Sequence, residues 1–178
     1  MLGQTFRAHR SLERLASATR SRPGIPLAPV REYGSPMFLT ELNWLGVLAG
    51  FVVYFVTGAI WFGPKTFYPA WMRAKGLDPA EPQGSHGMAV VFGMTALGAL
   101  VQVLALAIVL AFVAQATGDP VGPLGGALGG LLLGIGLVAA SSLSHRLFGG
   151  DGFRVWAIEV GGDVVGLTLA GLVVGLIG

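Results

Sequence analysis

Two acidic residues stand inside a long apolar stretch near the end of the sequence. Glu159 and Asp163 are four positions apart, so on a helix they share one face, one turn from each other. A charged side chain at the bilayer centre costs about 2.5–3.5 kcal/mol on insertion scales. Acids retained at such a cost are candidate functional residues, able to carry a proton or to bind a polar partner.

The last span cannot begin after Asp163, so this residue must lie within the membrane. Only about 14 apolar residues follow it, and a helix needs about 20 to cross a bilayer. At about 1.5 Å per residue, Asp163 lies ~12 Å deep and Glu159 ~6 Å deep. The same arithmetic puts Tyr54 of the first span at ~12 Å and Gln102 of the second span at ~18 Å from that side.

These depths predict a polar pocket in one half of the membrane. Its candidate residues are Tyr54, Gln102, Glu159 and Asp163. A protonatable Asp163 in such a pocket would suit a small proton-coupled transporter of a solute or cation. Two structural alternatives stay open: Asp163 only bonds Tyr54 or Gln102 to hold the bundle together, or Glu159 forms an ion pair with Arg146 or Arg154.

Other site chemistry finds little support in the sequence. Cys is absent, and His86 and His145 lack a nearby third ligand, so we expect no metal site. The Gly149–Gly152 stretch has no Lys-Ser/Thr after it and indicates a turn rather than a phosphate loop. No Ser-His-Asp arrangement appears. We therefore expect no enzyme activity and no cofactor.

The amino-acid composition indicates what kind of protein carries these residues. Of 178 residues, 53% are hydrophobic and only 11% are charged, and the mean hydropathy is +0.72. Soluble domains carry about 25% charged residues. This balance excludes a soluble enzyme and a disordered chain, and the formal net charge of +2 offers no nucleic-acid surface.

Four apolar runs are each long enough to cross a bilayer. They span about 44–62, 90–112, 124–143 and 155–177, with Gly- and Pro-rich breaks between them. The runs are continuous rather than alternating, which argues against a lipid-facing β-barrel. We expect an all-α fold, a four-helix transmembrane bundle, over residues 37–178.

Residues 1–36 differ from the rest in composition. They carry four prolines and most of the arginines, namely Arg7, Arg10, Arg14, Arg20, Arg22 and Arg31. No apolar core of a signal peptide is present. We expect a disordered or mis-called extension, with Met37 as the natural start; an organelle transit peptide is the alternative.

Basic residues in the short loops predict the orientation. Lys65, Arg73 and Lys75 lie between the first two spans, and Arg146 and Arg154 lie between the last two. The remaining loop and the C-terminus have none. If translation begins at Met37, both termini lie outside and the basic loops are cytoplasmic, as in a bacterial inner-membrane protein.

Glycines recur at helical spacing in the third and fourth spans. Gly122, Gly126, Gly130 and Gly134 form a GxxxG-type series, and Gly162 with Gly166 and Gly171 with Gly175 repeat the spacing. Small residues let helix backbones approach closely in lipid. The series predicts close packing within the bundle, or a homodimer face on the third span.

Aromatic motifs near the first span carry a family resemblance. Asn43-Trp44-Leu45 opens the span, Trp61-Phe62-Gly63-Pro64 closes it, and Trp71-Met72-Arg73 follows. Trp61, Pro64 and Trp71 read as an interfacial motif. The set resembles the domain-of-unknown-function 1761 family of small bacterial membrane proteins over about residues 37–178. The resemblance implies four spans and no known activity; the acids of the fourth span depart from the expected pattern.

The sequence thus predicts an integral membrane protein with a structural or accessory role. The alternative is a proton-coupled transporter that uses the intramembrane acid of the fourth span. Expected partners are the lipid bilayer and a second copy or another membrane protein.

Overall fold

A computed structural model of the chain describes residues 42–78 and 87–178, and its helices belong to one compact unit, Leu39–Gly178. The predictions for residues 1–36 and for His86 lie outside the described residues. Four helices are long and apolar enough to cross a membrane: Trp44–Trp61, Met88–Thr117, Pro123–Phe148 and Gly152–Ile177. The predicted all-α architecture with four spans is confirmed.

The first span is α2 (Trp44–Trp61), and the short helix α3 (Tyr68–Ala74) follows it. The second span is α4 (Met88–Thr117), which ends where Gly118 adopts a left-handed conformation with φ of 82°. It continues five residues past the predicted end at residue 112. At 30 residues, α4 is longer than a bilayer core requires, so it has room to tilt.

The third span consists of three consecutive helical segments. They are α5 (Pro123–Leu133), a π-helical segment η2 (Gly134–Ala139) and α6 (Ala140–Phe148). Pro123 suits the first turn of α5, where its missing N–H costs nothing. Ser141 to Arg146 continue the helix to Phe148, beyond the predicted end near residue 143.

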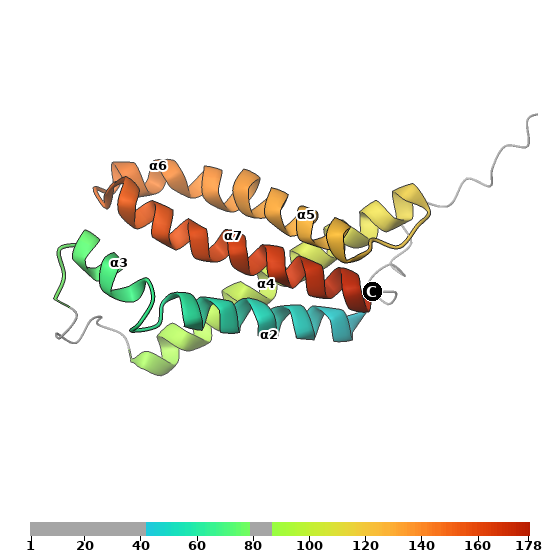
Figure 1. The fold of residues 1–178 in the computed structure, drawn as a ribbon, viewed down its shortest axis with the longest axis horizontal. Helices are drawn as coiled ribbons and strands as arrows, with labels where there is room; N and C mark the ends of the chain where they lie inside the picture. Colours follow the sequence, from blue (N-terminus) through green and yellow to red (C-terminus); the bar gives the residue numbers. More distant parts are fainter. Residues whose placement is uncertain (1–41, 79–86) are drawn as a thin grey trace, which may run out of the picture. The chain divides into compact units, whose positions relative to one another are not determined.

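The last span, α7 (Gly152–Ile177), is the centre of the bundle. It contacts every other described helix, with α2 on one side and α5 to α6 on the other (Figure 1). The helix α4 packs against both α2 and α7. Val47, Val103 and Leu106 are almost completely buried in the core between these helices.

Glycines line the contact between α5 and α7. A Cβ atom added at Gly126 would collide with the carbonyl oxygen of Gly171, and one at Gly130 would collide with that of Leu167. The same face continues to Gly175, where an added Cβ would lie 2.6 Å from the oxygen of Gly122. Only residues without a side chain permit this approach, so these glycines set the distance between the two helices.

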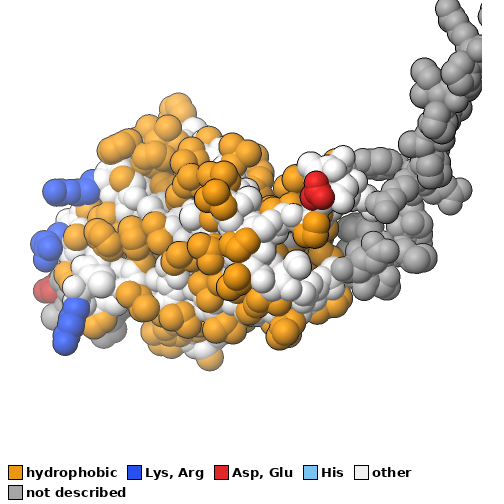
Figure 2. Space-filling view, turned by 45° about the vertical axis from the view of Figure 1, so that its right-hand side comes forward, with side chains coloured by type: hydrophobic (Ala, Val, Ile, Leu, Met, Phe, Trp, Pro, Cys, Tyr) orange, Lys and Arg blue, Asp and Glu red, His pale blue; other side chains and the backbone are white. Residues whose placement is uncertain are grey.

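The outward faces are apolar. Leu124 and Leu132 on the third span are 74% and 71% exposed, and Met94 on α4 is 64% exposed. Lys and Arg side chains gather at one end of the face in Figure 2, while its middle is hydrophobic. This distribution is the one expected of helices surrounded by lipid.

Candidate functional site

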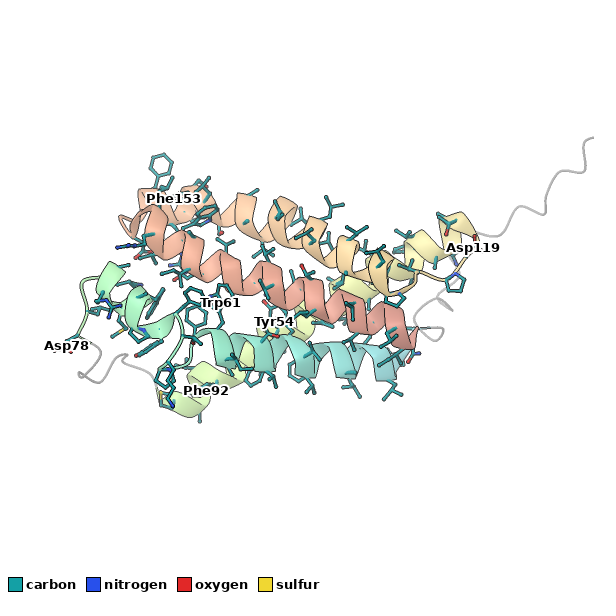
Figure 3. All side chains as sticks on the ribbon, in the orientation of Figure 1. Tyr54, Trp61, Asp78, Phe92, Asp119 and Phe153 are labelled. Atoms are coloured by element: carbon teal, nitrogen blue, oxygen red, sulfur yellow. The ribbon has the colours of Figure 1, made fainter. Side chains whose placement is uncertain are left out.

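Three polar side chains meet between α2, α4 and α7. The Tyr54 hydroxyl lies 2.8 Å from Asp163 Oδ1 and 3.2 Å from Gln102 Oε1. Tyr54 is 8% exposed and lies between α2 and α7 in Figure 3. We call Tyr54, Gln102 and Asp163 the intramembrane cluster. The structure thus brings together three of the four residues singled out for a polar pocket.

A glycine on α7 makes room for Tyr54. A Cβ atom at Gly166 would lie 2.9 Å from Cδ2 of the Tyr54 ring. Gly166 is three positions after Asp163, so both face α2 on the same side of α7. The ring therefore rests on the bare backbone at Gly166, and its hydroxyl reaches the carboxyl group one turn away.

The hydroxyl of Tyr54 has one proton for two acceptors. When it donates to an ionised Asp163, Gln102 can be a partner only by presenting its NH₂ group to the Tyr54 oxygen. When Asp163 is protonated, its O–H can donate to Tyr54, and Tyr54 can then donate to Gln102 Oε1. The intramembrane cluster can therefore satisfy either protonation state of Asp163 by reversing the direction of its hydrogen bonds.

Gln102 belongs to this cluster, although counting residues along its span places it deeper in the membrane than Tyr54. The count assumed a helix along the membrane normal, whereas α4 crosses behind α2 and α7 at an angle to them (Figure 1). A tilted helix gains less depth per residue. The tilt of α4 thus places Gln102 level with Tyr54.

Glu159 belongs to a different group of contacts. Its Oε1 accepts a hydrogen bond of 2.9 Å from Trp71 Nε1, and its Oε2 lies 2.8 Å from Arg146 Nε. Both carboxylate oxygens are therefore engaged at the basic end of the bundle. The ion pair with Arg146, which the sequence offered as an alternative to Arg154, is present.

This group closes into a ring of side chains. Asp151 bonds Arg146 Nη1 at 3.1 Å and lies 3.5 Å from Lys75 Nζ, and this ammonium lies 5.0 Å from the ring centroid of Trp71. The hydrogen bond from Arg146 holds the pKa of Asp151 below its ordinary value, with the charges of Lys75 and Arg146 adding to the effect. We call Trp71, Lys75, Arg146, Asp151 and Glu159 the ionic ring. It fastens α3 and the end of α6 to α7.

Trp61 of the predicted interfacial motif contacts α7. Trp61 Nε1 donates to the carbonyl oxygen of Ile158 at 2.9 Å, and its ring covers Gly161 and Gly162 of α7. Phe67 stacks on it with 4.3 Å between ring centroids. Trp61 therefore packs α2 onto α7. Pro64 lies exposed in the turn after α2.

Asn43 has a role that its residue type alone did not reveal. Its Oδ1 accepts from the backbone N–H of Gly46, which caps α2, and its Nδ2 donates to the carbonyl oxygen of Ile177 at 2.8 Å. The last carbonyls of a helix have no partner of their own within the helix. One amide thus joins the start of the first span to the end of the last. An Asn before an apolar run predicts the first bond but not the second.

The π-helical segment η2 has no recognisable signal in the sequence. Trp156 of α7 donates from Nε1 to the carbonyl oxygen of Ala139 at 3.2 Å and lies 3.2 Å from Ser142 Oγ. A π turn changes which carbonyls are paired within the helix, and π segments concentrate at functional sites. Here the indole supplies a donor at the boundary between the segment and α6.

A metal centre finds no support in the described ranges, 42–78 and 87–178. No group of three or more His, Cys, Asp or Glu residues there is placed to hold an ion. The cluster and the ring instead consist of hydrogen bonds and ion pairs among side chains.

The comparison with family models identifies the family. The model described as "Protein of unknown function (DUF1761)" matches residues 45–175. The chain belongs to this family. The DUF1761 match begins within α2 and ends within the last turns of α7, so it covers the four-span bundle and both groups of contacts. No curated protein and no solved structure matches the chain.

Proposed function

We propose that this DUF1761 protein is a small structural or accessory component of a membrane, without catalytic activity. The observation that supports the proposal is the pairing of polar groups inside the spans: Tyr54 bonds both Gln102 and Asp163. Among the described residues, no buried side-chain N or O atom is without a partner. A polar cluster satisfied across three helices holds a bundle in one arrangement.

We also propose a membrane and an orientation for this protein. One end of the bundle, where the first two spans and the last two spans are connected, carries Lys65, Arg73, Lys75, Arg146 and Arg154. The excess of basic residues favours a cytoplasmic position for this end, with both termini outside, in a bacterial inner membrane. We also propose that the GxxxG-type glycines of the third span pack against α7 within one chain; a homodimer or another membrane-protein partner would then use an outward face.

A second function is favoured by one observation on Asp163. No Lys, Arg or His in the described part of the chain forms an ion pair with this carboxyl group, although Glu159 and Asp151 both have cationic partners. An intramembrane acid bonded only to neutral groups is typical of proton-carrying sites. The alternative is therefore a small proton-coupled transporter with Asp163 as the proton site.

Proton flux separates the two proposals. The full chain is reconstituted in liposomes, and the uptake of protons is followed with a pH-sensitive dye for the wild type, Asp163→Asn and the matched control Glu159→Gln. A structural role predicts no flux above that of protein-free liposomes in any sample. Flux that is lost in Asp163→Asn and retained in Glu159→Gln would reject the structural role in favour of transport.

A further inference from the structure

The basic end of the bundle holds two classes of cation. Lys75 and Arg146 belong to the ionic ring, where Asp151 and Glu159 balance their charges. Lys65, Arg73 and Arg154 are exposed, and none of them lies within ion-pair distance of a carboxylate in the described residues. We call these three the basic rim. The ring is neutral as a whole, and the rim adds three positive charges that form no ion pair within the described residues.

The basic rim is carried by backbone that the packing holds in place. Lys65 lies in the turn closed by the stacking of Trp61 on Phe67. Arg73 follows Met72, which is fully buried, on a helix that the ionic ring ties to α7. Arg154 lies in α7 directly before Val155, which is fully buried, so packed elements carry all three cations at this end of the bundle.

Exposed aromatic side chains accompany the basic rim. Phe67 and Phe153 are 41% and 64% exposed, and Phe148 is 95% exposed. Amphipathic Tyr and Trp rings settle at the level of the lipid headgroups, and Tyr68 and Trp71 of α3 lie at this same end of the bundle. The cations beside them are then at the depth of the headgroup phosphates. Arg is suited to bind phosphate through two parallel hydrogen bonds, and Lys binds it as a point charge.

We propose that the basic rim, Lys65, Arg73 and Arg154, binds the headgroup phosphates of anionic phospholipids. The chemistry that recognises the ligand is positive charge fixed at headgroup depth, with no ion-pair partner among the residues that the structure describes. The inference is independent of the proposed structural role and of the protonation of Asp163, because the basic rim shares no residue with the intramembrane cluster.

Tryptophan quenching by brominated lipids tests this inference. Trp44 lies at the start of α2, whereas Trp61, Trp71 and Trp156 lie toward the basic end. The full chain with Trp44→Phe is reconstituted in two lipid mixtures. One contains brominated phosphatidylglycerol with unbrominated phosphatidylcholine, and the other contains brominated phosphatidylcholine with unbrominated phosphatidylglycerol. The ratio of quenching gives the relative affinity for the anionic lipid at the end where these three rings report.

The expected result is a preference for phosphatidylglycerol that depends on the basic rim. One cation near a membrane surface contributes roughly fivefold to the affinity for an anionic lipid. The triple variant Lys65→Gln, Arg73→Gln, Arg154→Gln should therefore lose on the order of 100-fold in relative affinity for phosphatidylglycerol. The control Lys65→Arg, Arg73→Lys, Arg154→Lys keeps the charges and should keep most of the preference. Circular dichroism of each variant checks that the helices remain folded.

Three outcomes would overturn the proposal. They are equal quenching by both lipids in the wild type, an unchanged preference in the folded triple Gln variant, and loss of the preference when millimolar inorganic phosphate is added. The last would show that the rim takes a soluble phosphate compound instead of a lipid. The proton-flux result is unaffected by any of these outcomes, so the two proposals fail separately.

Discussion

The Tyr54 hydroxyl donates to Asp163 Oδ1 across 2.8 Å, and this bond joins α2 to α7 inside the apolar part of the bundle. The same oxygen lies 3.2 Å from Gln102 on α4. Three helices thus share one hydroxyl group.

Tyr54→Phe keeps the ring on Gly166 and removes only the hydroxyl. We expect a loss of about 0.5–2 kcal/mol in unfolding free energy, the range measured for hydrogen bonds between membrane helices. Denaturation in mixed micelles, followed by tryptophan fluorescence, measures the loss. The control is Thr57→Val, since the Thr57 hydroxyl bonds only the carbonyl of Val53 in its own helix. Equal losses in both variants would contradict a role of Tyr54 between helices.

Gly126→Ala adds one methyl group where α5 meets α7. The new Cβ would collide with backbone at Gly171, which no rotamer change can relieve, so the helices must separate. We expect about 1–3 kcal/mol of destabilisation, the usual cost of overpacking. Gly98→Ala is the matched control, because a Cβ there meets nothing within 4 Å. A stable Gly126→Ala protein would mean that the two helices are farther apart than described.

Cross-linking can locate a second copy without disturbing this contact. Gly130 faces Leu167 within the chain, so a cysteine there would disrupt the packing it is meant to report. Leu132, at 71% exposure, carries the probe on the outward face instead. A homodimer through the outward face of the third span predicts a disulfide dimer of Leu132→Cys in native membranes; its absence would favour a monomer or a partner on another face.

The contribution of the ionic ring to folding stability should depend on pH. Because the hydrogen bond from Arg146 lowers the pKa of Asp151 in the folded state, the ionised form stabilises the fold above the unfolded-state value near 3.8. This contribution disappears as the pH falls through the lower folded-state pKa. The difference in unfolding temperature between wild type and Asp151→Asn should therefore shrink between about pH 5 and pH 2. A difference that does not change with pH would contradict the ion pairing of Asp151.

Two substitutions of Asn43 separate its two bonds. Asn43→Asp keeps an acceptor for the N–H of Gly46 but loses the donor to Ile177, whereas Asn43→Ala loses both. Hydrogen exchange should increase at the end of α7 in both variants, and at the start of α2 only in Asn43→Ala. The loss of the cap should cost about 1 kcal/mol. An unchanged end of α7 in both would contradict the link between the helix ends.

The extent of the first span and much of the intramembrane cluster can be predicted by counting residues along each helix. Helix rise fixes the depth of each residue, and the short apolar stretch after Asp163 forces this acid into the membrane. The equal depths of Tyr54 and Asp163 follow from the same count, and the structure places them in contact. Gln102 shows the limit of the method, because depth along a tilted helix depends on the packing that tilts it.

Length, hydropathy and charge are properties of each segment, so they suffice to predict the four spans, the basic end and the acid that a bilayer must accommodate. The contacts of Glu159 with Arg146 and Trp71, of Trp61 with Gly162, and of Asn43 with Ile177 arise from tertiary packing. Helices that are apolar on all sides carry no stripe that says which face meets which neighbour. Their rotation and pairing are set by close contact of whole surfaces, and that contact exists only once the bundle has formed.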